Sequence, residues 1–202
     1  MTDTPAHIDL KAVIVACAAT ISAHADELTS LDQAIGDGDH GYNMKRGFDA
    51  LLAEADALAA KPLPEALKAA GTKLVMTVGG ASGPLFGTFL MGLGKEMPAA
   101  PDRAAFAAAF ARAVDAVAAR GKSEAGQKTM LDVLYPVRDA LAAGTSCAEV
   151  AAAADAAAEA TVPMKALRGR ASFLGERSIG HMDPGSRSSA LLVRTVAETL
   201  GA

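Results

Sequence analysis

Three aspartates lie close together in one glycine-bearing stretch of the chain, residues 31–43 (LDQAIGDGDHGYN). Asp32, Asp37 and Asp39 carry the hard oxygen ligands that Mg²⁺ prefers, and the short Asp side chain fixes its oxygens with few free torsions. The glycines between them let the backbone fold tightly enough for the carboxylates to converge. The pattern therefore predicts a Mg²⁺ site whose remaining ligands are phosphate oxygens and water.

Other interpretations of this stretch fit less well. Residues 36–41 formally match the dinucleotide pattern G-x-G-x-x-G, but they follow a predicted helix instead of a strand, and their carboxylates would repel a pyrophosphate. An EF-hand needs Glu at position 12, and counting from Asp37 that position is Phe48. A solvated acidic cluster that caps the next helix remains the open alternative.

The residues that follow the acidic pair suit an anion. His40 beside a metal–phosphate site can donate to a phosphate oxygen or pack on a nucleotide, although a lone histidine is more often structural. Tyr42 and Asn43 open the next predicted helix, whose N-terminal N–H groups favour phosphate. We therefore expect nucleotide phosphates here.

Two further loops interrupt the helical pattern. Residues 79–84 (GGASGP) let the backbone approach a ligand closely, and the Ser82 hydroxyl can donate to phosphate. Residues 169–189 and their flank hold several arginines, whose forked guanidinium groups match phosphate oxygens. These are Arg168, Arg170, Arg177 and Arg187. For either loop, a tight helix connection or a salt-bridged surface loop is the alternative.

The elements that must position these loops are helices. The chain has 202 residues, of which 51% are hydrophobic and only 4% aromatic, and alanine dominates. Alanine is the best helix former and a poor strand former, so we predict an all-α fold in one domain, residues 1–202. The predicted helices are 8–30, 43–60, 63–78, 84–96, 101–120, 127–143, 146–167 and 185–200. Ser146 with Glu149 has the pattern of a capping box at the start of 146–167.

Charge and composition exclude several classes of partner and location. The net charge of −4 leaves no basic stripe for nucleic acid. No apolar run reaches the ~18 residues of a membrane span. Residues 11–25 resemble a signal peptide but continue in helical period, so we expect a first amphipathic helix and a cytoplasmic protein. Cys17 and Cys147 lie among alanines, and we expect small buried side chains.

Four longer segments together resemble a known family. They are Ala34–Phe48, Gly79–Phe89, Arg120–Asp132 and Gly169–Pro184. In this order they resemble the L subunit of dihydroxyacetone kinase, a domain that also forms the C-terminal half of the ATP-dependent dihydroxyacetone kinases. The resemblance covers nearly the whole chain.

The resemblance implies a fold and a site. The fold is an antiparallel eight-helix barrel with the nucleotide site in loops at one end. Asp32, Asp37 and Asp39 hold two Mg²⁺ ions that bridge the phosphates of ADP or ATP, and Arg170 stabilises the charge that develops during transfer. The residues implied around the nucleotide are His40, Gly41, Tyr42, Asn43, Ala81, Ser82, Gly121, Met130, Arg170, Asp183, Pro184 and Gly185.

The resemblance also implies partners. In the family, a separate K subunit binds dihydroxyacetone through a histidine. No residue of this chain looks like a nucleophile for the sugar carbonyl, so the chain is expected to supply the nucleotide. A multiphosphoryl M subunit carries a phosphohistidine that rephosphorylates bound ADP at the expense of phosphoenolpyruvate. Two alternatives stay open: an ATP-dependent split kinase for a triose or tetrose, and a nucleotide-bound interaction protein that contacts a transcription regulator.

Overall fold

The computed structural model describes residues 8–201, so residues 1–7 and 202 of the predicted domain lie outside the described residues. Within 8–201 the chain forms α-helices and one 3-10 helix, with no strand, which confirms the all-α prediction. The elements are α1 (Leu10–Ala23), α2 (Ala25–Ile35), α3 (His40–Ala53), α4 (Ala55–Ala59), α5 (Leu63–Thr77), α6 (Ser82–Glu96), α7 (Arg103–Gly121), α8 (Leu131–Ala142), α9 (Cys147–Glu159), η1 (Arg170–Ser178) and α10 (Pro184–Gly201).

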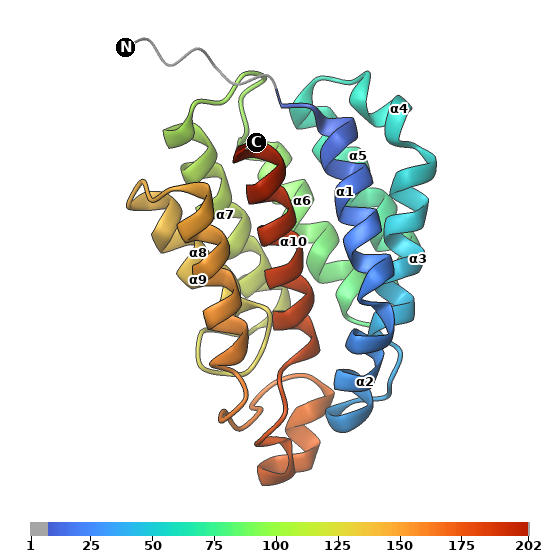
Figure 1. The fold of residues 1–202 in the computed structure, drawn as a ribbon, viewed down its shortest axis with the longest axis vertical. Helices are drawn as coiled ribbons and strands as arrows, with labels where there is room; N and C mark the ends of the chain where they lie inside the picture. The colour runs from blue at the N-terminus through green and yellow to red at the C-terminus, as the bar shows by residue number, and fades with distance from the viewer. Residues whose placement is uncertain (1–7, 202) are drawn as a thin grey trace.

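The long helices pack side by side around one core (Figure 1). α1 contacts α3, α3 contacts α5, and each helix from α5 to α10 contacts the next in turn. α10 then contacts α1, so that the neighbours close into a ring. The short helices α2 and η1 contact each other at one end of the molecule, the lower end in Figure 1.

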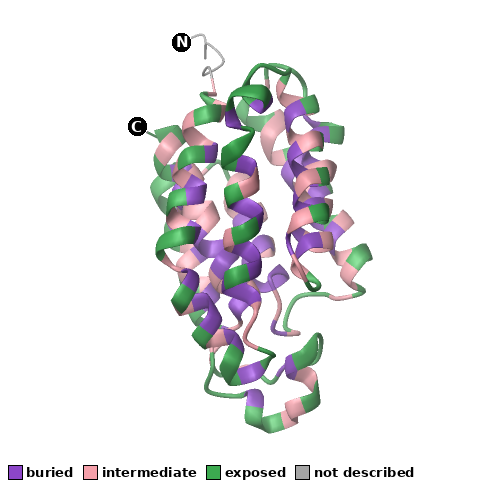
Figure 2. Cartoon of the chain, turned by 90° about the vertical axis from the view of Figure 1, so that its right-hand side faces the viewer, coloured by how far each residue is buried: buried purple, intermediate pink, exposed green. Residues whose placement is uncertain are grey.

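Apolar side chains and alanines fill the centre of this ring. Ile21, Leu28 and Met44 are fully buried, and burying such a side chain stabilises the fold by about 1.5–3 kcal/mol. Ala113 and Ala190 are equally buried, and their small side chains let neighbouring helices approach closely. Figure 2 shows the buried residues along the inward faces of the helices. The alanine-rich composition thus produces close helix packing.

A close and reciprocal backbone approach joins α5 to α6. A Cβ atom on Gly71 would lie 2.7 Å from the carbonyl oxygen of Gly87, and a Cβ atom on Gly87 would lie 2.7 Å from that of Gly71. Real Cβ atoms do not come so close to backbone oxygens, so both positions require glycine. This contact fixes the two helices that flank the loop at residues 78–81.

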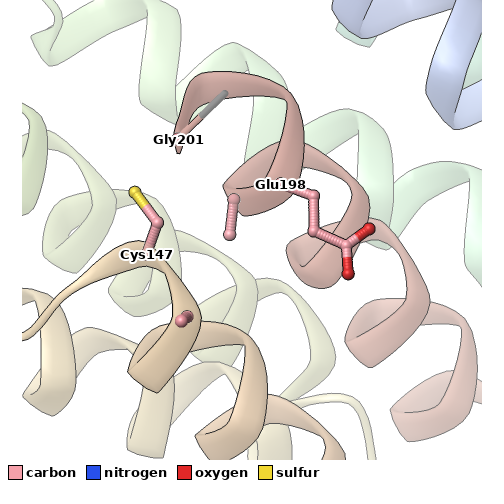
Figure 3. Close-up of a pocket in the computed structure, with 5 residues that line it drawn as sticks. Cys147, Glu198 and Gly201 are labelled. Carbon is pink, nitrogen blue, oxygen red and sulfur yellow. The ribbon is translucent and has the colours of Figure 1, made fainter.

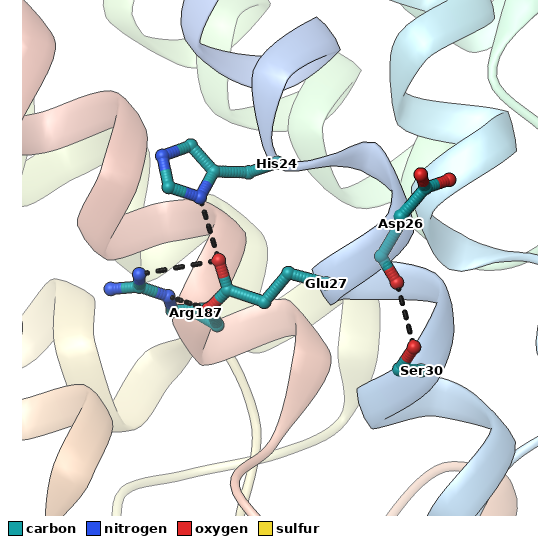
Figure 4. Close-up of polar contacts among 5 residues, drawn as sticks. All are labelled: His24, Asp26, Glu27, Ser30 and Arg187. Carbon is teal, nitrogen blue, oxygen red and sulfur yellow. Dashed lines mark hydrogen bonds and ion pairs between the residues drawn. The ribbon is translucent and has the colours of Figure 1, made fainter.

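The first predicted helix, 8–30, is wrong in one respect, because it is two helices. α1 and α2 meet at His24 with a bend of 55°. His24 Nδ1 lies 2.6 Å from Glu27 Oε2, next to Arg187 (Figure 4). α2 then continues to Ile35, which places Asp32 on a helix and not in the loop we expected.

Other predicted helices also differ from the structure: 43–60 is divided into α3 and α4, and several helix ends are shifted. α3 begins at His40. α8 begins only at Leu131, because the Asp132 carboxylate accepts the N–H groups of Gly126 (2.5 Å) and Thr129 (2.7 Å) and holds a loop there. α9 starts with the predicted capping box, formed by Ser146 and Glu149, and ends at Glu159. Turns follow, and a proline at position 163 lacks the N–H that a helix would need.

The two cysteines behave differently. Cys17 is buried as predicted, and burial raises its pKa to about 12. For Cys147 the prediction is wrong: this residue is exposed at the first turn of α9.

Among residues 8–201 no single helix is long and apolar enough to cross a membrane. By length and composition, only the bent pair α1 and α2 passes that test.

Candidate functional site

The three predicted aspartates come together at the end of α2. Asp32, Asp37 and Asp39 each place one carboxylate oxygen within 4.8 Å of the other two. Asp32 is buried in the last turn of α2, Asp37 is exposed in the loop, and Asp39 immediately precedes α3. Three hard oxygen donors at this spacing fit a divalent cation such as Mg²⁺.

Backbone contacts of Asp32 shape this loop. Its Oδ2 accepts the N–H groups of Asp39 (2.9 Å) and His40 (3.1 Å) and so caps the start of α3. A Cβ atom on Gly36 would collide with Oδ1 of the same carboxylate. Gly38 has a φ of 75°, which favours glycine. Helix capping and cation binding are therefore compatible roles for one side chain, because a carboxylate has lone pairs enough for both.

His40 lies under the acidic loop and joins three helices. Its ring is buried, with Nδ1 3.0 Å from Ser82 Oγ and Nε2 2.9 Å from Ser188 Oγ. Burial lowers the pKa of His40, against the opposing effect of Asp32 and Asp39. The neutral ring has one N–H that donates and one nitrogen that accepts. One serine hydroxyl therefore accepts the N–H of the ring, and the other donates to the second nitrogen.

The N-termini of α3, α6 and α10 meet around this histidine. His40 is the first residue of α3, Ser82 the first of α6, and Ser188 lies in the first turns of α10. Helix N-termini carry positive partial charge and orphan N–H groups, which favour anions. A phosphate beside the acidic loop would meet these three helix ends.

The glycine loop at residues 78–81 is tied to α3 by two side chains. Arg46 donates from Nε to Thr77 O (2.7 Å) and from Nη2 to Asn43 Oδ1 (2.8 Å). A Cβ atom on Gly79 would collide with Asn43 Oδ1. The arrangement places Asn43 beside the loop that holds Ala81, while Tyr42 is exposed next to it.

The start of α10 lies beside the start of α8. Asp183 Oδ2 accepts the Ser186 N–H at 2.7 Å and caps α10. A Cβ atom on Gly185 would lie 3.7 Å from Met130. Burial raises the pKa of Asp183 to about 7; the Ser186 hydrogen bonds oppose this rise, and nearby Asp132 adds to it.

Two hollows occur on the described surface, and they lie at opposite ends of α10. The first, of about 360 Å³, adjoins Gly121 and is lined by Lys122, Ser123, Gln127 and Arg168, among others. The second, of about 230 Å³, lies between Cys147 and Gly201 (Figure 3). The 18 residues of α10 span about 27 Å, so the second hollow lies far from the carboxylates.

Of the predicted phosphate-binding arginines, Arg170 reaches the acidic loop. Its guanidinium forms an ion pair with Asp37. Arg187 instead lies with Nε 2.6 Å from Glu27 Oε1 (Figure 4), and Arg168 donates to Gln127 Oε1 at 3.2 Å. Arg170 is the first residue of η1, which packs on Ile35 of α2 through Ala171, and Ala166 ahead of η1 joins the same cluster.

Comparison with known proteins places this chain in a family. The model of the DAK2 domain matches residues 34–198. The chain belongs to the DAK2 domain family. It is 44% identical over 173 residues to the ADP-binding subunit DhaL of PEP-dependent dihydroxyacetone kinase 1 from Listeria innocua, covering 85% of this chain and 86% of that one. It is 41% identical over 191 residues to the corresponding DhaL of Escherichia coli K12, covering 90% and 91%.

Solved structures show the same fold. The dihydroxyacetone kinase of C. freundii aligns with this DAK2 domain with a TM-score of 0.78 and 25% identity, over 96% of this chain. The chain spans about a third (35%) of that kinase. A second structure of the same kinase, in complex with AMP-PNP and Mg²⁺, aligns with a TM-score of 0.74 and 26% identity over 96% of this chain and 34% of that one.

Sequence analysis missed several residues of this DAK2 domain that shape the site. Asp132, which orders the loop before α8, had a usable signal, because Thr129 and Asp132 have the spacing of a capping box. Ser188 and Lys128 had none. Their hydrogen-bond partners lie far away in sequence, and a single serine or lysine carries no local pattern.

Proposed function

We propose that this chain is the ADP-binding subunit of a phosphoenolpyruvate-dependent dihydroxyacetone kinase, one domain over residues 1–202 that acts in the cytoplasm. The observation that carries the proposal is the cluster of Asp32, Asp37 and Asp39, paired with Arg170 and surrounded by helix N-termini. Similarity to DhaL subunits along nearly their whole length supports it.

In this proposal the three aspartates hold two Mg²⁺ ions. The donor set of three carboxylates suits that ion, and a related kinase was solved with AMP-PNP and Mg²⁺. Bound Mg²⁺ supplies charge neutralisation at the terminal phosphates of the nucleotide. Asp32 keeps the acidic loop in shape through its two backbone hydrogen bonds.

The remaining site residues bind and orient the nucleotide. Phosphoryl transfer passes through a loose transition state, so positioning and charge stabilisation account for most of the catalysis. The N–H groups at the starts of α3, α6 and α10 bind phosphate oxygens, and Arg170 stabilises the charge that develops on the transferred group. The proposed nucleotide contacts are His40, Gly41, Tyr42, Asn43, Ala81, Ser82, Gly121, Met130, Arg170, Asp183, Pro184 and Gly185.

Two partner subunits complete the reaction. A phosphohistidine on an M subunit would pass its phosphoryl group to ADP held by this chain. The same group would then pass to a hydroxyl of dihydroxyacetone on a K subunit, and the proton of that hydroxyl would be released to solvent. ADP then remains on this chain as a cofactor. We include contact with a transcription regulator as a further partner role of the same nucleotide-bound chain.

One observation favours a second candidate, an ATP-dependent kinase for a triose or tetrose. The structurally similar C. freundii kinase binds AMP-PNP, an analogue of ATP. Purified chain, mixed with K subunit, separates the two: turnover of dihydroxyacetone with phosphoenolpyruvate and the M subunit supports the first candidate, and turnover with ATP alone supports the second. Absence of turnover with either donor would favour a purely regulatory protein.

Asp37→Ala tests the site itself. This change removes one cation ligand and the partner of Arg170, so we expect ADP affinity in the presence of Mg²⁺ to fall by about 10²-fold or more. Calorimetric titration with and without a chelator measures it. Asp56→Ala, at an exposed aspartate paired with Lys11, is the matched control. Unchanged ADP binding in Asp37→Ala would contradict the assignment of the acidic loop as the Mg²⁺ and nucleotide site.

A further inference from the structure

Lys128 is a buried lysine that the proposed mechanism does not use. It is 1% exposed and lies in the loop before α8 with a φ of 62°. A positive φ is uncommon for a residue other than glycine, and a buried ammonium is unfavourable unless it is hydrogen-bonded. Tertiary contacts must therefore hold Lys128 in place.

Two backbone carbonyl oxygens accept hydrogen bonds from the Lys128 ammonium. Lys128 Nζ donates to Met164 O at 3.0 Å and to Ser178 O at 2.6 Å. Met164 and Ser178 are the ends of one segment, residues 164–178, which contains η1. The buried Ser178 hydroxyl closes the segment further, because it accepts the Ala166 N–H (2.9 Å) and donates to Gly175 O (2.6 Å).

This segment depends on such contacts for its shape. η1 is a 3-10 helix interrupted at Gly175, which has a φ of 58°, and Gly169 before it has a φ of 66°. Helices of this type are short and weakly stabilised by their own hydrogen bonds. Arg170 lies at the start of η1, so the position of its guanidinium beside Asp37 depends on how the segment is anchored.

We propose that Lys128 is a positioning residue for Arg170. Its ammonium joins the two ends of segment 164–178 and thereby holds Arg170 at the acidic loop. Lys128 acts through the segment, since its hydrogen bonds go to backbone carbonyls and not to the carboxylates. The inference rests on the proposed function for the role of Arg170 in phosphoryl transfer.

Limited proteolysis tests whether Lys128 anchors segment 164–178, and it requires no measurement of phosphoryl transfer. Lys128→Met keeps a long apolar side chain but removes both hydrogen bonds. We expect trypsin to cleave after the exposed Arg168, Arg170 and Arg177 about tenfold faster, measured by mass spectrometry of the fragments. Lys68→Met, at an exposed lysine on α5, is the matched control and should leave the rate unchanged. If circular dichroism shows Lys128→Met unfolded, Lys128→Gln, whose shorter side chain cannot reproduce both hydrogen bonds, replaces it here and in the kinetic measurement below.

A double-mutant cycle then tests whether the anchoring acts through Arg170. Phosphoryl transfer is measured with K subunit and donor for Lys128→Met, Arg170→Ala and the double variant. We expect Lys128→Met to slow transfer by about tenfold in the parent and by less than about twofold in Arg170→Ala, because coupled residues are not additive.

Each result decides something. Unchanged cleavage in Lys128→Met overturns the anchoring. Equal losses of transfer in both backgrounds overturn the link to Arg170 and leave Lys128 a structural residue. Full transfer in Arg170→Ala overturns the role of Arg170 and the inference with it. Absence of transfer by the unaltered chain contradicts the proposed function itself and is recognised before any variant is compared.

Discussion

At the scale of single residues, environment separates carboxylates of the same type. Asp32 is a cap that accepts two backbone N–H groups. Asp183 accepts one such group and is half-buried, and desolvation raises its pKa to about 7. Asp37 is exposed and paired with Arg170. One side-chain chemistry thus serves as a helix cap, a proton-binding half-buried acid and a proposed cation ligand.

Asp183 predicts a pH dependence of stability. Between its ordinary pKa of 3.8 and about 7, the folded chain keeps a proton that the unfolded chain has released. The free energy of unfolding therefore falls as pH rises through this window, by at most about 1.4 kcal/mol per pH unit. Asp183→Asn keeps an acceptor for the Ser186 N–H but does not titrate.

The stability of Asp183→Asn relative to the parent should therefore increase from about pH 5 to about pH 7. Urea unfolding at intervals across this range measures it. Asp49→Asn, at an exposed aspartate paired with Lys45, is the control and should not show this increase. A constant difference between Asp183→Asn and the parent at every pH would show that Asp183 does not titrate near neutrality in the folded chain.

At the scale of elements, the two ends of the molecule differ in whether side chains cap the N–H groups at the helix starts. The N-termini of α3, α6 and α10 meet around His40, whose ring contacts Ser82 and Ser188, and N–H groups at helix N-termini favour anions. α9 begins at the far end of α10, where Cys147 lies close to Gly201. Its capping box satisfies N–H groups with the side chains of Ser146 and Glu149. Of the helix starts at the site, that of α6 has no side-chain cap and is left for a ligand, whereas the start of α9 is closed by its own side chains.

Ser146→Ala should therefore reduce stability and leave the site intact. Loss of the side-chain cap costs about 1 kcal/mol (range about 0.5–2), because an N–H group in the first turn of α9 loses its acceptor. Chemical unfolding gives the change, and Ser146→Asp, which retains a capping oxygen, should recover most of it. Calorimetry should find ADP affinity unchanged; an equal loss of affinity would mean that the two ends are coupled.

At the scale of the whole molecule, the ring of helices is a scaffold with chemistry at one end. Its core joins distant segments, and His40 alone contacts serines 42 and 148 residues away along the chain. Since the site consists of connections between core helices, a ligand that binds there stabilises the folded chain as a unit.

ADP with Mg²⁺ should therefore stabilise the entire fold. At a free concentration of about 100 times its Kd, ADP raises the free energy of unfolding by about 2.7 kcal/mol. Thermal unfolding, followed with ADP, with ADP and Mg²⁺, and with added chelator, measures the shift. The stabilisation should disappear with the chelator. A shift that persists without the metal would indicate a nucleotide site independent of the aspartates.

The sequence by itself determined the local part of this protein. The alanine-rich segments predicted the helices, and Ser146 with Glu149 predicted the cap of α9. The convergence of Asp32, Asp37 and Asp39 was also predictable, because these residues lie close together along one short glycine-bearing stretch of the chain. Short separations leave few conformations to choose among, so residue type and spacing are sufficient.

Only the tertiary structure decided the contacts between distant segments. Residue type and spacing did not distinguish Arg170, which reaches Asp37, from Arg187, which reaches Glu27; only the family resemblance singled out Arg170. Nor did it show that Lys128 anchors the segment around Arg170. A guanidinium or an ammonium has many available partners along a chain, and the packing of η1 against α2 and of the helices around the ring selects which of them it meets.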